Sequence, residues 1–354
     1  MERDARVQSA ITNWAPRFVA NGIDVNDFTR VTNSIERWDA WCQTWADCGA
    51  IHEQLGADAE TRGYYETAGE HYFRAAMCYH FGKYLFVQDT RQLRNAHEHV
   101  VRDYQHALPY FLFPGERVSI PYEGGATMYG ILRKPWYAPH PPVVILVPGL
   151  DSVKEELHVY GEDFLRRGMA VLAIDGPGQG EMEFEHAMRH DYEVPIRYAI
   201  DYLERRPDVD ARRVGLMGVS FGGHYVVRAA AFEKRVKATI ENCGAYNQLE
   251  NFRGRPQLSR DAMVFRLKAA SEEEAVKRLE QFSLQGVAER VQCPLLAIQG
   301  GQDGLVSPEH GKRIAAEAGA NAELWFFADG NHVCNNIPYK HRPQQADWMR
   351  KQLS

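Results

Sequence analysis

The sequence predicts an α/β fold with a doubly wound, mostly parallel sheet, preceded by a helical N-terminal domain. Three observations predict it. Short apolar runs alternate with helical patterns through the C-terminal two thirds of the chain. One of these runs leads into the pattern G-x-S-x-G at residues 218–222 and then into a helix-prone segment. Residues 1 to about 112 instead contain hardly any β-like runs, and aromatic and apolar residues recur there at helical spacing.

Length and composition limit the classes of protein to consider. A chain of 354 residues exceeds the usual size of one domain, so we expect a helical domain at 1–112 and a sheet domain at 113–354. A net charge of -6 gives no reason to expect nucleic acid or an anionic membrane as a partner. The charged N-terminus leads into no apolar signal segment, and no run approaches the roughly 20 apolar residues of a membrane span. The expectation is a cytoplasmic protein.

The six cysteines are scattered and form no CxxC pair. Cys42 and Cys48 could pair or bind a metal, but free and mostly buried thiols in a reducing compartment fit the pattern better. We therefore expect no metal site and no cofactor.

Three helices are expected in the N-terminal domain. The first carries an aromatic stripe that includes Trp38, Trp41 and Trp45, with Ser34 as its N-cap. The second and third cover residues 61–87 and 89–104. The aromatic side chains are interpreted as helix–helix core rather than as a cofactor site.

The sheet domain begins after Pro114-Gly115, and a β-hairpin is expected over 118–132. Continuous apolar runs predict strands buried on both faces, at 143–147, 171–174, 214–217, 238–240 and 295–298, and 324–327 is expected to be the last strand. The helical segments between them include 155–167, 193–205 and 222–232. Residues 250–290 interrupt the alternation and are interpreted as a polar, helical, solvated excursion.

Ser220 is the expected nucleophile. A strand, a G-x-S-x-G turn and a helix together lift a serine hydroxyl to the carboxyl edge of a parallel sheet. Gly218 and Gly222 leave room where a Cβ would collide with the neighbouring strand or helix. The start of the following helix points backbone N–H groups at the anion that forms during acyl transfer.

A serine hydroxyl also needs a base and an acid that orients the base. In α/β-hydrolases the order is serine, acid, histidine. Asp303 follows the strand at 295–298, and His332 follows the last strand, so both fall on the edge that holds Ser220. Asp329 is the competing acid, on the loop of the histidine itself. His224, four residues after the serine, is interpreted as packing or at most as lining the pocket.

Two backbone N–H groups should form the oxyanion hole. One is that of Phe221, directly after the nucleophile, and the other is that of Leu150, in the loop after the strand at 143–147. The glycine-rich loop 175–181 lacks the Lys-Ser/Thr of a nucleotide-binding loop and is interpreted as a tight turn near the pocket.

These motifs resemble one branch of the α/β-hydrolases, which contains 2,6-dihydroxypseudooxynicotine hydrolase and the fungal heptaketide hydrolases. The matching segments are 149–156, 175–181, 218–223, Asp303 and 329–332, together with 74–82 in the helical half. The resemblance covers most of the chain and implies a helical cap domain that closes over the substrate, a homodimer, and hydrolysis of a carbon–carbon bond next to a ketone.

Asp151 marks a departure from that branch, because the bacterial enzyme is understood to use a glutamate at the matching position as an extra catalytic group. An acid beside the oxyanion loop could protonate a carbon leaving group. Alternatively, Asp151 caps the helix that starts near Val153. Both interpretations remain open in the sequence.

The leading hypothesis is a serine hydrolase that cleaves a carbon–carbon bond in a β-diketone-like or acyl-aromatic metabolite. The aromatic-rich cap favours an aromatic or polyketide-like small molecule as substrate. A carboxylesterase or amidase with the same triad is the alternative, and a non-catalytic binding protein on a hydrolase scaffold is a third.

Overall fold

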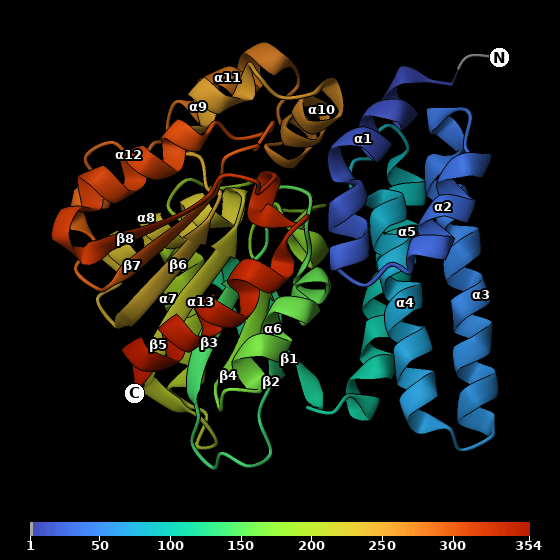
Figure 1. The fold of residues 1–354 in the computed structure, drawn as a ribbon, viewed down its shortest axis with the longest axis horizontal. Coiled ribbons are helices and arrows are strands. Elements are labelled where there is room, and N and C mark those ends of the chain that lie inside the picture. The colour runs from blue at the N-terminus through green and yellow to red at the C-terminus, as the bar shows by residue number, and fades with distance from the viewer. Residues whose placement is uncertain (1–2) are drawn as a thin grey trace. The chain divides into compact units, whose positions relative to one another are not determined.

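The computed structural model describes residues 3–354, which divide into two compact units (Figure 1). One unit comprises Met1–Glu116 and Pro256–Ala262, and the other comprises Arg117–Arg255 and Met263–Ser354. The first unit is helical, and the second contains the sheet.

The helical unit is built from long helices that pack side by side, with α3 against α4 and α4 against α5 (Figure 1). Aspartates cap three of them, because each carboxylate accepts an otherwise unpaired N–H of the first turn. The helices are α1 (Ala5–Ala20), α2 (Val25–Ser34), α3 (Trp41–Thr61), α4 (Tyr65–Lys83) and α5 (Thr90–Ala107).

Aromatic side chains form the core of this unit, as expected. Phe18 stacks on Phe81 with 4.0 Å between the ring centroids, and Trp41 and Trp45 are fully buried beside them. The expected N-cap is wrong, because Ser34 is the last residue of α2 and its hydroxyl donates to the carbonyl of Val31. The chain leaves the helix there in an extended conformation and passes through a short 3-10 turn before α3 begins.

The second unit contains an eight-stranded sheet in the order β1-β2-β4-β3-β5-β6-β7-β8. β2 runs antiparallel to β4, and β4, β3, β5, β6, β7 and β8 run parallel. The predicted doubly wound, mostly parallel sheet is confirmed. The strands are β1 (Gly115–Pro121), β2 (Thr127–Arg133), β3 (Pro142–Val147), β4 (Ala170–Asp175), β5 (Asp210–Val219), β6 (Val236–Asn242), β7 (Leu295–Gly300) and β8 (Ala322–Phe327).

Helices cover both faces of the sheet, which explains why central strands such as β3 and β4 are almost entirely apolar. One face carries α6 (His158–Leu165) and α13 (Pro338–Leu353), and the other carries α7 (Glu193–Leu203), α8 (Phe221–Phe232) and α12 (Pro308–Ala318) (Figure 1). β3 lies between β4 and β5, where the strand order changes direction. Ligands of open α/β sheets bind outside the carboxyl ends of the strands at such a switch point.

The segment 250–290 is not the solvated excursion expected from its polarity. It forms α9 (Gln248–Phe252), α10 (Gln257–Arg266) and α11 (Glu272–Leu279). Its sparse apolar residues are buried in the main core of the sheet unit, among them Met263, Leu267, Ala275 and Leu279. Polar side chains of the segment are buried as well, among them Arg255 and Arg266, so a polar composition does not make this segment a solvated one.

Across residues 3–354, every helix is too short or too polar to cross a bilayer.

Candidate active site

Ser220 occupies a strained turn between β5 and α8. Its φ of 55° and ψ of −118° are rarely adopted by a residue with a side chain, and its N–H is held by the carbonyl of Asn242 at 2.7 Å. The turn closes only because of the flanking glycines. A Cβ on Gly218 would lie 2.1 Å from the carbonyl oxygen of Gly222, and a Cβ on Gly222 would lie 2.3 Å from that of Val147. The predicted strand–turn–helix context of Ser220 is present.

Two loops bring a histidine and a carboxylate to this serine. His332 follows β8, and its Nε2 lies 2.8 Å from Ser220 Oγ. The other ring nitrogen, Nδ1, lies 2.8 Å from Oδ2 of Asp303, which follows β7. Because an ionised carboxylate only accepts hydrogen bonds, Asp303 fixes the proton on Nδ1 and leaves Nε2 free to accept the serine proton.

The environment of Asp303 keeps it ionised. Burial alone would raise its pKa, but the His332 imidazole, its hydrogen bond, and the N–H groups of Val306 and Leu305 hold the pKa below the ordinary value of 3.8. Both N–H groups donate to Oδ1 at 2.8 Å. Oδ2 therefore remains directed at the imidazole as a negative charge.

The other two candidates from the sequence lie elsewhere. Asp329 is exposed and pairs with Lys340 on the surface, so it does not hold the imidazole. His224 is buried with Nδ1 2.9 Å from the carbonyl of Ala245, and burial lowers its pKa to about 4. It packs beneath the site as an uncharged ring.

The loop after β3 runs directly against the serine. A Cβ on Gly149 would lie 3.2 Å from Cβ of Ser220 and 3.8 Å from the backbone nitrogen of Phe221. The buried Leu150 follows in the same loop. The two residues expected to supply the oxyanion donors thus lie on adjoining segments beside Ser220.

Asp151 is 9% exposed in that loop, and the helix-cap interpretation is wrong. The helix after the loop begins at Lys154, with Val153 as its N-cap, and the N–H of Lys154 donates to Asp175 at 2.8 Å. The carboxylate that accepts this N–H is therefore that of Asp175, the last residue of β4, and not that of Asp151. Burial lowers the pKa of the Arg255 guanidinium, and the negative charges of Asp151 and Asp303 oppose that shift, so a buried cation belongs to the electrostatic surroundings of both carboxylates.

Sequence reasoning missed two residues at this edge of the sheet. Arg255 lies in the segment dismissed as solvated, and no motif marks it. Gln179 lies in the glycine-rich loop after β4 and is fully buried, with its Nε2 donating to the carbonyl of Pro148 at 2.6 Å and to that of Gly149 at 3.2 Å. The signal that could have found Gln179 is a polar side chain in a loop otherwise made of glycine, proline and acids.

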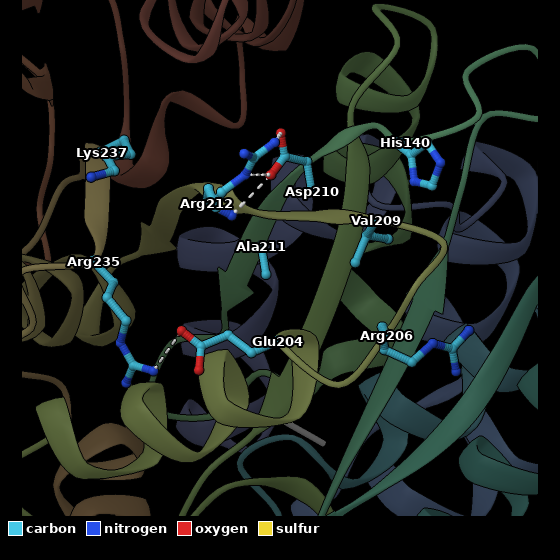
Figure 2. A pocket seen from close by; sticks show the side chains of 9 residues that line it. All are labelled: His140, Glu204, Arg206, Val209, Asp210, Ala211, Arg212, Arg235 and Lys237. Carbon is cyan, nitrogen blue, oxygen red and sulfur yellow. Dashed lines mark hydrogen bonds and ion pairs between the residues drawn. The ribbon is translucent and has the colours of Figure 1, made fainter.

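A hollow of about 580 Å³ lies at the opposite edge of the sheet. Figure 2 shows the side chains that line it. The hollow is lined by the amino ends of β5 and β6, and β5 separates it from Ser220 by about 30 Å of extended chain. Its arginines are already paired, as Arg212 with Asp210 and Arg235 with Glu204. This hollow is not where the serine acts.

Among the described residues, two groups of side chains outside the site have the residue types of a metal centre. In one of them, Glu53, His99 and Asp103, the guanidinium of Arg102 already pairs with both carboxylates. In the other, Cys48, His52 and Cys78 are buried in the helical unit, with 3.6 Å between the two sulfur atoms, so Cys48 faces Cys78 and not Cys42 as considered from the sequence. The guanidinium of Arg30 lies 3.4 Å from Cys48 Sγ, and both nitrogens of His52 already contact other side chains. A metal ion would have to displace the positively charged Arg30 from Cys48, so this group does not fit a metal ion.

Comparison with known proteins agrees with this fold. Residues 28–354 match the family described as "Esterase FrsA-like". The chain belongs to this family. Esterase FrsA from Yersinia pestis is 26% identical over 333 residues, covering 88% of this chain and 77% of that protein.

The 2,6-dihydropseudooxynicotine hydrolase of Paenarthrobacter nicotinovorans is more similar in extent, with 27% identity over 97% of this chain and 92% of that protein. The crystal structure of 2,6-dihydroxy-pseudo-oxynicotine hydrolase superposes with a TM-score of 0.88 at 28% identity, covering 96% of both chains. The alpha/beta hydrolase pydG of Acremonium sp is 33% identical over 238 residues, which span 62% of this chain and 55% of that protein. The protein is therefore an α/β-hydrolase, and the recognised branch is confirmed.

Proposed function

We propose that this protein is a serine hydrolase in which Ser220 is the nucleophile, His332 the general base and Asp303 the acid that orients the base. The observation that carries the proposal is the continuous contact from Ser220 Oγ through both ring nitrogens of His332 to Asp303, with 2.8 Å at each step. A surface histidine would not need a buried carboxylate with two further N–H donors behind it.

The proposed reaction begins with attack of Ser220 Oγ on a carbonyl carbon while Nε2 of His332 takes the hydroxyl proton. The N–H groups of Phe221 and Leu150 stabilise the oxyanion of the tetrahedral intermediate. The intermediate collapses, the proton that His332 took from Ser220 passes to the leaving group, and the acyl group stays on the serine. Water then attacks the acyl-serine with His332 again as base, which releases a carboxylic acid and restores the enzyme.

We further propose that the bond broken is a carbon–carbon bond next to a ketone, in a β-diketone-like or acyl-aromatic substrate. Support comes from the resemblance to the 2,6-dihydroxypseudooxynicotine hydrolase branch along nearly the whole chain. A second support is Asp151, a carboxyl group in the oxyanion loop that does not cap the following helix. A carbon leaving group departs as an enol or carbanion and requires a proton, whereas the leaving group of an activated ester does not.

Ester or amide hydrolysis is the second candidate. The family description names an esterase, and the same serine, histidine and aspartate suffice for that reaction. Asp151 would then take no part in the reaction, so the effect of replacing Asp151 distinguishes carbon–carbon hydrolysis from ester or amide hydrolysis.

The experiment compares wild type, Ser220→Ala and Asp151→Asn on an aryl 1,3-diketone and on a p-nitrophenyl ester. Ser220→Ala should abolish turnover of both substrates, and more than about 1% residual kcat would remove Ser220 from its role. Asp151→Asn should lower kcat on the diketone by about 10²-fold or more, the usual contribution of a positioned acid, and leave the ester nearly unaffected. The ester thus controls for damage to the triad. Small and equal losses on both substrates would contradict the carbon–carbon assignment.

The remaining expectations are part of the proposal. They are a cap domain formed by residues 1–112, a homodimer, a cytoplasmic location, and a reaction that uses no metal or cofactor. Light scattering tests the dimer, and activity after exhaustive dialysis against a chelator tests the chemistry.

A further inference from the structure

The glycine-rich loop after β4 contains one uncharged polar side chain, Gln179, which is fully buried and hydrogen-bonded at both ends. Its Nε2 donates to the carbonyl oxygens of Pro148 at 2.6 Å and of Gly149 at 3.2 Å. Its Oε1 accepts from the hydroxyl of Tyr192 at 2.7 Å and from the N–H of Gly176 at 3.2 Å. Because Oε1 has two donors facing it, the amide cannot be turned round, and its NH₂ is committed to the two carbonyls.

Those two carbonyls belong to the loop that lies against Ser220. In a trans peptide the C=O of one residue and the N–H of the next point in opposite directions, and the described chain contains no cis peptide. By holding the carbonyl of Gly149, Gln179 directs the N–H of Leu150 away from itself. By holding the carbonyl of Pro148, it does the same to the N–H of Gly149.

The loop whose carbonyls Gln179 holds lies against the nucleophile. A Cβ on Gly149 would lie 3.2 Å from Cβ of Ser220 and 3.8 Å from the backbone nitrogen of Phe221, so the peptide between Gly149 and Leu150 borders the place where a bound carbonyl oxygen is expected. An oxyanion donor is most effective when its direction is fixed before the charge appears, because a donor that must reorient during the reaction loses part of the stabilisation that it gives to the transition state.

Buried ion pairs in turn hold the backbone of the loop that carries Gln179. Nζ of Lys154 contacts Asp175 at 2.9 Å and Glu181 at 2.8 Å, and these two acids bracket the loop that carries Gln179. Lys154 follows the oxyanion loop, so the two loops are bound together on both sides of the amide. The two acids and Gln179 thus all hold the loop after β4 against the loop after β3.

We propose that Gln179 is the positioning residue of the oxyanion hole: its amide grips the carbonyls of Pro148 and Gly149 and so points the Leu150 N–H at the reacting carbonyl oxygen. This inference rests on the proposed serine-hydrolase function. Gln179 does not touch substrate; it acts through the direction of a backbone N–H.

The test uses Gln179→Met, which keeps the length and volume and removes the donors, and Gln179→Glu, which replaces the NH₂ by a titratable oxygen. Gln345→Met is the matched control, since Gln345 is equally buried but lies on α13. The readouts are kcat and KM on a p-nitrophenyl ester, the rate at which a fluorophosphonate labels Ser220, and thermal unfolding.

Gln179→Met should lower kcat and the labelling rate by about 10- to 100-fold, less than the roughly 10²–10³ that loss of an oxyanion donor itself costs. KM should change little, since the contact to the oxyanion forms fully only in the transition state. Gln345→Met should label at the wild-type rate.

Gln179→Glu supplies a signature that a purely structural role would not. An ionised carboxylate repels both carbonyl oxygens, whereas the protonated acid can donate to one of them. Labelling by this variant, divided by that of wild type at the same pH, should therefore rise as the pH falls from about 8 to about 6. The facing phenol of Tyr192 stays neutral over this range because burial raises its pKa well above 10. Lys154 stays charged because, although burial lowers its pKa, the carboxylates of Asp175, Glu155 and Glu181 together raise that pKa above its ordinary value. The ratio for Gln179→Met should not depend on pH.

The outcomes separate this inference from the proposed function. If the fluorophosphonate fails to label Ser220 in wild type, the serine-hydrolase function itself is wrong. If wild type is labelled and Gln179→Met is labelled equally fast, the function stands and the role of Gln179 is overturned. Should Gln179→Met fail to fold, Gln179→Glu decides alone, and a ratio that does not change with pH overturns the inference.

Discussion

Replacing Asp303 by asparagine should disable the enzyme by forcing the wrong tautomer of His332. In the wild type, Oδ1 of Asp303 accepts two backbone N–H groups at 2.8 Å each, and Oδ2 faces Nδ1 of His332. An asparagine must keep its single oxygen where the two N–H donors are, since its NH₂ would oppose them. The NH₂ is then directed at Nδ1, and the ring proton moves to Nε2, which faces Ser220.

A histidine with its proton on Nε2 cannot accept the serine proton, so the loss is chemical and not structural. Aspartate-to-asparagine replacement in a triad of this kind costs about 10⁴ in kcat. We expect a loss of that order on a p-nitrophenyl ester, with the helix and sheet content unchanged by circular dichroism. The rate of fluorophosphonate labelling should fall in parallel, because it reports the nucleophile without product release.

Asp329→Asn is the matched control, with the same change of one carboxylate to an amide on the loop of His332. Asp329 is exposed and pairs with Lys340 at the surface, and such pairs contribute little, so activity should stay within about twofold of wild type. Retention of more than about a tenth of wild-type kcat by Asp303→Asn would refute the tautomer argument. A larger loss in Asp329→Asn than in Asp303→Asn would refute the assignment of the acid itself.

Two further predictions concern stability. Burial raises the pKa of Glu241 to about 8 from an ordinary value of 4.5, so the folded state favours the protonated carboxyl. The contribution of this group to the free energy of unfolding is therefore fully present below about pH 4.5 and is lost as the pH rises to about 8. Glu241→Gln, whose side-chain oxygen can still accept the N–H of Gly244, should remove that pH dependence and stabilise the protein by on the order of a few kcal/mol above neutral pH. Urea unfolding of both proteins at pH 5 and pH 8 checks this, and an equal change of the free energy of unfolding with pH in the two proteins would refute it. Gly222→Ala should lower the free energy of unfolding by about 1–3 kcal/mol or more and abolish labelling of Ser220, because its Cβ meets the backbone oxygen of Val147 at 2.3 Å; an alanine variant with wild-type melting would contradict the close packing of the turn.

Most of the sheet could be predicted from the sequence, and the reason is physical. A parallel strand covered on both faces is mostly apolar, so β3, β4, β7 and the second half of β5 appear in the sequence as apolar runs. Parallel strands end at a common edge, so knowing which strand precedes Ser220, Asp303 and His332 is enough to expect them together. The contacts between these three residues agree with that expectation.

The failures have the opposite origin. Ser34 has the chemistry of an N-cap, but whether a helix begins or ends at a serine depends on the turn that follows, which tertiary packing decides. Asp151 likewise has the chemistry of a cap, and the N–H that it was expected to accept is taken by Asp175, 21 residues away from Lys154. In the segment 250–290, spaced apolar residues are enough to reach the core, although the overall composition is polar.

The sequence pattern therefore does not predict which charged and hydrogen-bonding side chains of one loop pair with the next loop at this site. The loop after β3 and the loop after β4 each resemble ordinary turns when considered alone. Together they form a unit in which Lys154 contacts Asp175 and Glu181, and Gln179 holds the carbonyls of the segment beside Ser220. The serine, histidine and aspartate define which chemistry is available, and the loop pair sets the direction of the backbone donors that receive the developing charge. It follows that two α/β-hydrolases with the same three residues can differ in rate by orders of magnitude through residues that never meet the substrate.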